Sequence, residues 1–594
     1  MKFFRQALVI SLRFLLRVFP ASLVNVLKEN PKLLALYSRN IHKSGLLHKL
    51  PTPAELSRLY TENLCHQNKL ICDIEMNLER ERFISPIILI LMPKLLREQL
   101  NESLQSILAM KGVASQVVVW CENEHVVEAR RFLNNDSPDN CGYAVISELV
   151  ELERLTNSQN SCFIINCGDR VHASLNYVLA ENIDDMTSIL YCDTDSYNHL
   201  KQHLDPKFKP NWNPDLQLTT GYVSSGIWVD SFQQLYGKLI LSGSGIAQYL
   251  MILYLENNRI DSIKNIPLVL VSQNQNFKLN LSEVSAYTRG LLDACGKVTV
   301  DERELIRIEW NISSPPLVSL IIPTRNGLNL VKACIESILT KTTYAHYEIL
   351  LIDNNSDDPE CLSYFDLLAQ NEKIRVISYK HEFNYSAINN FAVSHANGDI
   401  IGLINNDVEV ISPDWLSSMV GHAIREDIGC VGAKLLYSNE LIQHAGVVLG
   451  YGQSAGHAHK FYPATHSGYM NRLVSSHNVS AVTAACLLVK KELFEAVNGL
   501  NEKRLSIAFN DVDFCLKVQS LHVRNVYCAE AVLFHHESVS RGLEDTAEKQ
   551  QRFRSELNYL REQWPEFIQN DPAYNPNLTL KRENFSIKGH SEYR

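Results

Sequence analysis

Carboxylates and asparagines gather in the second half of the chain at places where apolar runs stop. The clearest case is LINNDVEV (403–410), where a run typical of a buried parallel strand ends in Asn405, Asn406 and Asp407. Alone, such a cluster is a solvated turn after a strand. The same oxygens at the carboxyl end of a strand also suit a ligand or a hard cation. Other polar residues close to this cluster in the fold would favour a ligand or cation site over a solvated turn.

Two further apolar runs end in the same way. Pro323, Thr324 and Arg325 follow VSLII, and Asp353 follows EILLI. Because strand ends in an open α/β sheet face one crevice, we expect these side chains to meet those of 405–407. More acids and histidines follow downstream, namely Asp511, Asp513, His535 and His536. Such a set is hard to assign to turns alone.

The elements that would position these residues occur twice. A β-α-β opening begins at Ser85 with SPIILILMP, and another begins at Pro316, about 230 residues later. A repeat of that length indicates tandem domains. The sequence predicts a helical segment at 1–80, a first domain at 81–281, a linker with a short helix at 282–315, and a second domain with a C-terminal helical tail at 316–594.

The motifs of the second copy resemble those of a known family. VSLIIPTRNG, ILLIDNNSDD, LINNDVEV, VTAACLLVKKELFEAVNGLNE, FNDVDFCLKV and LFHHESVSRG occur in the order and spacing of family 2 glycosyltransferases with the GT-A fold. The chain is most similar to two-domain bacterial members that build O-antigen or other surface polysaccharide, whose first domain resembles 190–223. The resemblance implies an α/β protein with two tandem GT-A domains, Rossmann-like nucleotide-diphospho-sugar transferase folds, and a helical N-terminal extension.

The resemblance also implies roles on the donor side of a site. Asp353 would bind the nucleotide base, with Pro323, Thr324 and Arg325 shaping that pocket. Asn405, Asn406 and Asp407 occupy the place of the family's acidic metal motif, with Asp407 as the metal ligand. Mg²⁺ or Mn²⁺ would bridge to the diphosphate of the nucleotide-sugar donor and assist its departure. The family often has more acid here, and Glu409 is a candidate to compensate.

The remaining implied roles concern the acceptor and the leaving group. Asp511 matches the family's catalytic base, which takes a proton from a sugar hydroxyl during an inverting displacement. His535 matches a metal or diphosphate contact, with His536 as the alternative. Arg541 would contact diphosphate, the alternative being a solvated loop charge. Asp513, two residues from Asp511, lies on another helix side and equally suits a helix N-terminus.

The first copy has the same spacing of apolar runs as the second but lacks most of the polar residues that follow them. NCGD retains only Asp169, GSGIAQYL supplies no carboxylate where Asp511 is expected, and LVLVSQ replaces the histidine. Asp193 and Asp195 in CDTDS come after the place of the metal motif and are discounted. We therefore expect an inactive first domain that serves as a scaffold, an acceptor platform or a dimer surface.

Composition and the N-terminus indicate where the protein acts. A net charge of −10, a pI near 6.1 and no basic stripe argue against a nucleic-acid partner. Fourteen cysteines without a CxxC pair suit a reducing cytoplasm. Residues 2–28 can form a basic amphipathic helix, which predicts a peripheral protein at the inner face of the plasma membrane. The alternatives are docking on its own protein or an atypical signal sequence.

The expected function is transfer of a sugar from a nucleotide-diphosphate sugar to a hydroxyl of a growing surface glycan carried on a lipid. One alternative is a degenerate scaffold of a glycan-assembly complex. Another is a nucleotidyltransferase, disfavoured because its glycine- and basic-rich phosphate loop is missing. His457 and His459 in GYGQSAGHAHK lack a third ligand and are interpreted as part of a mobile loop near the acceptor.

Overall fold

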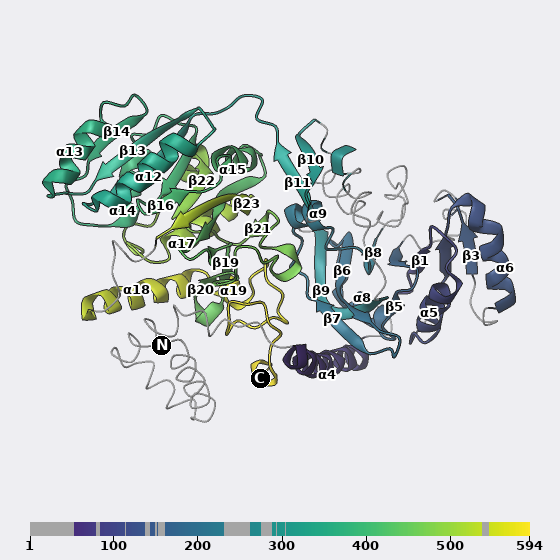
Figure 1. Cartoon of the computed structure of the whole chain (residues 1–594). Coiled ribbons are helices and arrows are strands. Elements are labelled where there is room, and N and C mark those ends of the chain that lie inside the picture. Colours follow the sequence, from purple (N-terminus) through teal and green to yellow (C-terminus); the bar gives the residue numbers. More distant parts are fainter. Residues whose placement is uncertain are drawn as a thin grey trace.

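The computed structural model has two lobes, connected by a hairpin and by the C-terminal tail (Figure 1). The structure describes residues 53–78, 84–112, 115–136, 143–148, 151, 161–230, 262–274, 285, 288–290, 292, 294–302, 305–536 and 546–593. The helix expected at 2–28, the segment GSGIAQYL and Arg541 lie outside these residues.

The N-terminal lobe follows helix α4 (Pro53–Asn77) and is built on a sheet of nine described strands. Its elements are β1 (Ile87–Leu91), α5 (Arg97–Leu108), β2 (Val117–Trp120), η4 (Asn123–His125), α6 (Val126–Asp136), β3 (Tyr143–Ile146), β4 (Cys162–Asn166), β5 (Arg170–Val171), α8 (Leu175–Asn182), β6 (Ile189–Tyr197), β7 (His203–Lys207), α9 (Pro214–Thr220), β8 (Ile227–Val229) and β9 (Ile263–Asn274). The strand order is β3-β2-β1-β4-β8-β6-β9-β5, with β7 paired to β6.

The C-terminal lobe has a second large sheet, with the order β14-β13-β12-β15-β22-β17-β23-β16. Its elements are β12 (Val318–Thr324), α12 (Leu328–Lys341), β13 (Tyr347–Asp353), α13 (Pro359–Leu368), β14 (Ile374–Ser378), α14 (Tyr385–Val393), β15 (Ile400–Ile404), β16 (Val408–Val410), α15 (Trp415–Ala423), β17 (Ile428–Leu436), β18 (Ile442–His444), β19 (Val447–Leu449), η7 (Tyr451–Gln453), β20 (Ala455–His457), η8 (Tyr469–Asn471), β21 (His477–Val479), β22 (Cys486–Lys490), α16 (Lys491–Ala496), α17 (Asn510–Gln519) and β23 (Arg524–His535).

The two sheets follow one plan. Taken in chain order, β1 to β6 correspond to β12 to β17, β7 corresponds to β18, and β8 and β9 correspond to β22 and β23. The orientations agree as well, because β6 and β9 run parallel, as do β17 and β23, whereas β5–β9 and β16–β23 are antiparallel. The repeat seen in the sequence is therefore a repeat of strand topology.

Each sheet is buried on both faces, which explains the near-continuous apolar strands. Val318, Leu320 and Ile322 of β12 face one core together with α12, whereas Ile321 faces the other. Successive side chains of a strand point to opposite faces, so one strand serves two cores. The second core is closed by α14 and α17, and α17 later carries Asp511.

The segment between the lobes has helical residues at 285 and 288–290 and, after them, two strands that the predicted linker does not include. It contains an antiparallel hairpin of β10 (Gly296–Val300) and β11 (Ile306–Trp310), and β11 contacts α9 of the first lobe and α15 of the second. Trp310 lies under the Arg425 guanidinium at 4.2 Å from the ring centroid. The polar composition of 282–314 predicts a linker, whereas packing between the two lobes stabilises 296–310 as strands.

The C-terminal tail continues the helices α18 (Ala547–Gln563) and α19 (Pro565–Gln569) as an extended segment that ends in η9 (His590–Glu592). Asn575 Nδ2 donates to Asp193 Oδ2 of β6 at 2.9 Å, and Asp571 Oδ2 accepts from Leu449 N of β19 at 2.7 Å. Asn63 Nδ2 of α4 donates to Asn577 Oδ1 at 2.9 Å. The tail thus binds both lobes and α4.

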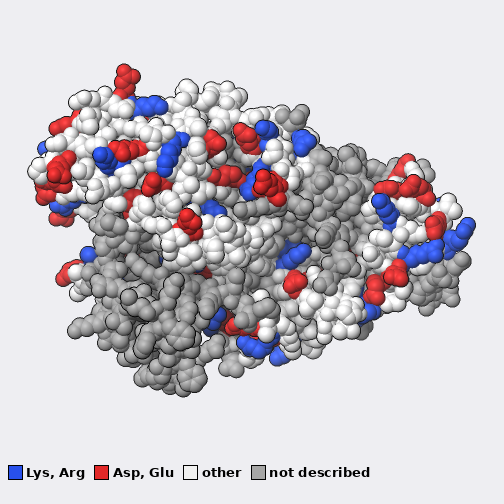
Figure 2. All heavy atoms as spheres, viewed as in Figure 1, with Lys and Arg blue, Asp and Glu red and all other residues white. Residues whose placement is uncertain are grey.

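On the face shown in Figure 2, Lys and Arg are interspersed with Asp and Glu over the described residues, without segregation by sign. No helix among the described residues has the length and apolar character needed to cross a bilayer.

A buried ion pair connects the lobes. Asp215 of α9 accepts from Arg425 Nη1 at 2.5 Å and from Asn478 Nδ2 at 2.7 Å, and Arg524 Nη2 lies 3.8 Å from its carboxylate. Burial alone would raise the pKa of Asp215, but Arg425 and Arg524 hold it well below its usual range. The charged form is therefore the stable one in the folded protein.

We predict that Asp215→Ala lowers stability by about 3–5 kcal/mol at pH 7, because the buried Arg425 loses its shorter ion pair and keeps the longer one with Asp427, at 3.3 Å. Since the folded pKa is depressed, this contribution is present above the unfolded pKa near 4 and is lost as pH falls below it. Urea unfolding at pH 7 and at low pH measures it. Glu128→Ala, which removes an exposed pair with Arg97, should cost less than about 1 kcal/mol.

Candidate functional site

Three parallel strands of the C-terminal lobe deliver polar residues to one edge of the sheet. β12 pairs in parallel with β13 on one side and with β15 on the other. Thr324 lies opposite Asp353 in the β12–β13 register, and Asn406 Nδ2, just past β15, donates to Thr324 Oγ1 at 2.9 Å. The strand ends at 323–325, 353 and 405–407 are thus brought together.

Asp407 and His535 meet because β16 and β23 are paired. Val408 lies opposite His535 in this antiparallel pair, so the preceding residue, Asp407, comes beside the imidazole. Asp407 Oδ1 is 3.1 Å from His535 Nε2, and Asn405 Nδ2 is 3.2 Å from the same nitrogen. Asp407 is 5% exposed and His535 is 8% exposed. The pair forms a nearly enclosed oxygen and nitrogen donor set.

The adjacent histidine has a different environment. His536 Nδ1 is 2.8 Å from Ser438 Oγ, and His536 Nε2 is 3.4 Å from Glu409 Oε2. Glu409 also lies 3.4 Å from Lys341 Nζ. Of the two histidines left open by the sequence, His535 is therefore the neighbour of Asp407, and Glu409 faces His536 and Lys341 instead.

Asp511 occupies the first turn of α17, after Phe509, whose φ is +59°. Its Oδ2 accepts from Ala484 N at 3.2 Å and its Oδ1 from Val512 N at 2.9 Å. Burial raises the pKa of Asp511, while hydrogen bonds from Ala484, Thr483 and Val512 oppose the rise. A carboxylate with a raised pKa is a stronger base at neutral pH.

Asp513 points to a different part of the lobe. Its Oδ1 accepts from Trp564 Nε1 at 2.9 Å, and its Oδ2 lies 3.7 Å from Lys517 Nζ. It is 1% exposed, and burial raises its pKa. Asp513 therefore anchors the C-terminal helices onto α17.

Tyr385, at the start of α14, links the two halves of the site. Its hydroxyl lies 3.3 Å from Asn405 Oδ1 and 3.0 Å from the carbonyl oxygen of Ala484, whose own N–H donates to Asp511. One ring thus connects the strand end beside Asp407 with the backbone that holds Asp511. No pattern in the sequence singles out Tyr385, because the residues around it form an ordinary helix start.

The remaining predicted residues lie at the rim of this edge. Asp353 is half-buried, and its Oδ1 accepts from Ser356 N at 3.0 Å. Pro323 lies opposite Ile352 in the β12–β13 register, and the Arg325 side chain is exposed. Arg541 lies outside the described residues.

The sequence predicts a mobile loop around His457 and His459, but the structure has a strand that ends at His457. β20 pairs with β19 and ends at His457, whose Nδ1 is 2.7 Å from Nδ1 of His444. His459 is fully buried, stacks on Phe585 and accepts from Tyr469 N at 3.0 Å. His444 is therefore a neighbour of His457 that only the fold brings close, whereas His459 packs against the tail residue Phe585.

The corresponding edge of the N-terminal lobe has a different set of side chains. Arg170 and Ser272 form the register pair that Val408 and His535 form in the second lobe, so Ser272 stands where the histidine would be. Asp169, next to Arg170, is 1% exposed and accepts from Asn166 N at 3.0 Å and from Ser225 Oγ. Burial raises the pKa of Asp169 to about 7.

The acids discounted in the sequence have structural partners. Asp193 accepts from Lys209 N at 2.8 Å as well as from the tail. Asp195 accepts from the Tyr60 hydroxyl of α4 at 2.5 Å and lies 2.6 Å from His203 Nδ1. These carboxylates therefore hold the tail and α4 on the first lobe.

Two other side-chain groups have the spacing of a cation site, His422–Cys528–Glu530 and Glu122–Glu124–His125. In the first, Arg307 Nη1 is 3.0 Å from Glu530 and Arg425 Nη1 is 3.4 Å from His422, which disfavours a further cation. Neither group includes a residue predicted from the motifs.

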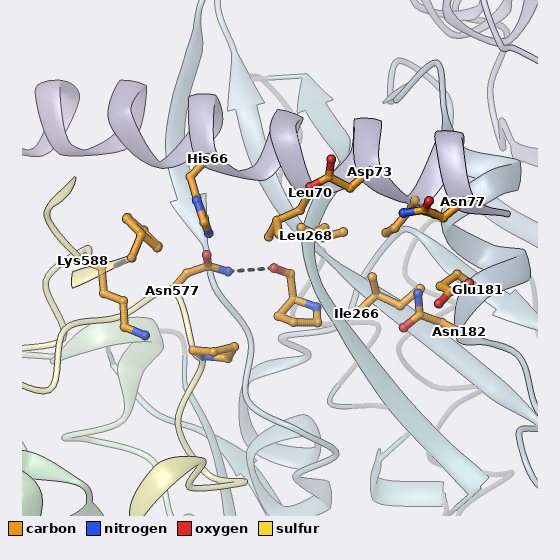
Figure 3. A pocket seen from close by; sticks show the side chains of 14 residues that line it. His66, Leu70, Asp73, Asn77, Glu181, Asn182, Ile266, Leu268, Asn577 and Lys588 are labelled. Carbon is orange, nitrogen blue, oxygen red and sulfur yellow. Dashed lines mark hydrogen bonds between the residues drawn. The ribbon is translucent and has the colours of Figure 1, made fainter. Parts of the chain in front are cut away.

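A cavity of about 570 Å³ lies elsewhere, between α4, β9 and the C-terminal tail. Figure 3 shows His66 and Leu70 extending from α4, with Ile266 and Leu268 of β9 beyond them and Asn577 and Lys588 on the tail side. None of the residues predicted from the motifs lines it.

Residues 319–497, from β12 to the residue after α16, match the family model described as glycosyl transferase family 2. This part of the chain is therefore a family 2 glycosyltransferase domain, and the resemblance inferred from its motifs is confirmed.

The chain is 42% identical over 421 residues to an uncharacterized protein, y4gI, of Sinorhizobium fredii, a match that covers 67% of this chain and 46% of the relative. It is 31% identical over 442 residues to the O-antigen biosynthesis protein RfbC of Myxococcus xanthus, with 71% of this chain and 34% of the relative covered. The chain thus spans less than half the length of these relatives. A mannosyltransferase from Pyrobaculum calidifontis, solved in complex with GDP-Man and Mn²⁺, aligns with a TM-score of 0.33 and 15% identity over 44% of this chain and 68% of that chain.

The buried Asp169 gives a prediction for the first lobe. Its folded pKa of about 7 lies above the unfolded value near 4, so its ionisation opposes folding as pH rises through 7. We predict that Asp169→Asn stabilises the protein at pH 8 by up to about 4 kcal/mol, and that the gain vanishes below about pH 4. Urea unfolding against pH measures it. The exposed control Asp185→Asn should change little at either pH.

Proposed function

We propose that the protein is an inverting glycosyltransferase that uses Asp511 as the base and Asp407 with His535 as ligands for a divalent cation. The observation that carries this proposal is the connection through Tyr385, whose hydroxyl contacts Asn405 beside Asp407 and the Ala484 carbonyl beside Asp511. Burial raises the pKa of Asp511, and the cation-type donor set of Asp407 and His535 belongs to the same lobe, whose residues 319–497 match the family 2 model.

In this proposal Asp511 takes the proton of an acceptor sugar hydroxyl as its oxygen attacks the anomeric carbon of the donor. The new carbon–oxygen bond forms while the bond from the anomeric carbon to the nucleotide diphosphate breaks, and the electron pair leaves with the diphosphate. A single displacement inverts the configuration. The N–H groups of Ala484 and Val512 fix the carboxylate, so it is already oriented for the hydroxyl.

The residues around His535 fit a divalent cation. Gln443 Oε1 lies 2.8 Å from His535 Nδ1, which places the ring proton on Nδ1 and leaves the Nε2 lone pair facing Asp407 Oδ1. Two acceptors at 3.1 Å repel each other unless a proton or a cation lies between them. Asp407 and His535 would hold Mn²⁺ or Mg²⁺, which when bound neutralises charge on the departing diphosphate.

The other predicted residues bind the donor in this proposal. Asp353 binds the nucleotide base beside Pro323, Thr324 and Arg325, while Asn405, Asn406 and Arg541 contact the diphosphate sugar. The Asn406 amide already bonds Thr324, which orients both side chains at the rim.

The broader role that we propose is transfer to a growing surface polysaccharide at the cytoplasmic membrane face. The similarity to the O-antigen biosynthesis protein RfbC supports the polysaccharide, and the basic amphipathic sequence 2–28 supports the membrane surface and a lipid-linked acceptor. The shared strand order supports tandem GT-A folds. The first lobe, with Ser272 at the histidine position, acts as a scaffold in this proposal.

Asp511→Asn removes the proposed base while keeping the shape of the side chain. We predict that transfer falls by about 10²–10⁴-fold with little change in donor affinity. Donor hydrolysis and transfer across a panel of nucleotide sugars with Mn²⁺ measures the loss. A degenerate scaffold would instead show no turnover in the unaltered protein and an unchanged glycan phenotype in the variant.

Asp407→Asn should weaken Mn²⁺ binding by at least about tenfold, because a charged oxygen ligand is lost. Electron paramagnetic resonance of free Mn²⁺ gives the dissociation constant without substrate. Glu409→Gln is the matched control, since Glu409 faces Lys341 and His536, and should keep the affinity. Equal weakening by both variants would contradict the assignment of Asp407.

A further inference from the structure

Strand β18 contains a bulge beside the proposed site. Leu435 of β17 lies opposite His444, but Leu436 lies opposite Ile442, so Gln443 is one extra residue on β18. A bulge leaves its residue out of the ladder and turns side chains away from strict alternation. The side chains of the neighbours Gln443 and His444 can therefore both reach the region of the proposed site. In a regular strand, adjacent side chains would point to opposite faces of the sheet.

Gln443 serves the cation side of the site. Its Oε1 is 2.8 Å from His535 Nδ1, and its side chain is 3% exposed. A ring held by Nδ1–H keeps its Nε2 directed at Asp407, 3.1 Å away. Partners of this kind commonly fix the tautomer and orientation of a metal-binding histidine.

His444 serves the base side. It is fully buried, and its Nε2 accepts from Gly446 N at 3.3 Å and from Thr483 N at 3.4 Å. The Thr483 side chain hydrogen-bonds Asp511, and Ala484 N donates to Asp511 Oδ2 at 3.2 Å. His444 therefore fixes the two-residue segment that holds the carboxylate.

The contact with His457 completes the proton arrangement. His444 Nε2 accepts two backbone N–H groups, so His444 carries its proton on Nδ1 and donates it to His457 Nδ1 at 2.7 Å. His457 must then carry its own proton on Nε2. Burial lowers the pKa of His457 to about 3 and that of His444 well below its usual value, in agreement with two neutral rings.

We propose that the bulged pair Gln443–His444 is the positioning element of the active site: Gln443 orients His535 for the cation, and His444, held by His457, orients Thr483 and Ala484 around Asp511. This inference rests on the proposed function of Asp511, Asp407 and His535. Gln443 and His444 are positioning residues, because each acts through another side chain or the backbone.

The proposal separates the effects of two variants on full-length protein. Gln443→Leu should raise the Mn²⁺ dissociation constant at least tenfold in the paramagnetic resonance assay, and Gln443→Glu, which still accepts from Nδ1–H, should stay within threefold. His444→Leu should leave the Mn²⁺ dissociation constant within threefold and lower kcat at least 100-fold. In the plot of kcat/KM against pH, the acidic limb should move to higher pH by about one unit. The limb moves upward because Asp511 loses donors that lower its pKa.

Histidine-selective ¹⁵N NMR of the unaltered, metal-free protein tests the proton arrangement without any activity. Resonances assigned with the His444→Gln, His457→Gln and His535→Gln variants should show protons on Nδ1 of His444, Nε2 of His457 and Nδ1 of His535. A proton on Nε2 of His444 would overturn the proposal, as would unchanged Mn²⁺ affinity in Gln443→Leu when Asp407→Asn has lost it. Unchanged affinity in Asp407→Asn would instead count against the proposed function.

Discussion

β12 is hydrogen-bonded to a parallel strand on each side, and this arrangement controls the chemistry of the C-terminal lobe. Three chain segments leave the sheet at the same edge because β13, β12 and β15 run in one direction. An antiparallel strand of seven residues would have put its polar end about 20 Å away at the opposite edge. At this edge the backbone ladder stops, so polar side chains reach solvent and each other while the apolar runs stay buried on both faces.

The pairing of β16 with β23 adds the histidine to this edge. It sets Val408 opposite His535 and so places Asp407 beside the imidazole, although the two residues are distant in the chain. The first lobe repeats the pairing with Arg170 and Ser272. The same backbone plan is compatible with different edge residues because buried apolar contacts stabilise it, whereas side chains at the sheet edge contribute little to either core.

The carboxylates of the first lobe make structural contacts with other parts of the chain. The buried Asp193 and Asp195 bind the tail and α4, and Asp215 binds Arg425 of the second lobe. A buried carboxylate is stable only with such partners. The tail in turn bonds β19 through Asp571, one strand away from β20 and His457. The first lobe therefore supports the second through the tail.

The amino-acid sequence by itself determined the strand ends, the repeat and the family. The apolar runs that end in Thr324, Asp353 and Asn405 can be recognised as strands because burial on both faces requires continuous apolar residues. The motif order matches a family 2 domain. The sequence did not determine the hairpin at 296–310, since that pairing depends on packing between two lobes.

Only the tertiary structure decided how the site is held together. The choice of His535 over His536 depends on strand register, which assigns adjacent residues to different neighbours. Tyr385, Gln443 and His444 act through contacts with residues that are distant in the chain. The sequence alone does not show that His457 has a histidine neighbour, because His444 lies on another strand. Residue type and spacing specify which groups a strand presents, but only the packing of distant segments fixes which of those groups touch.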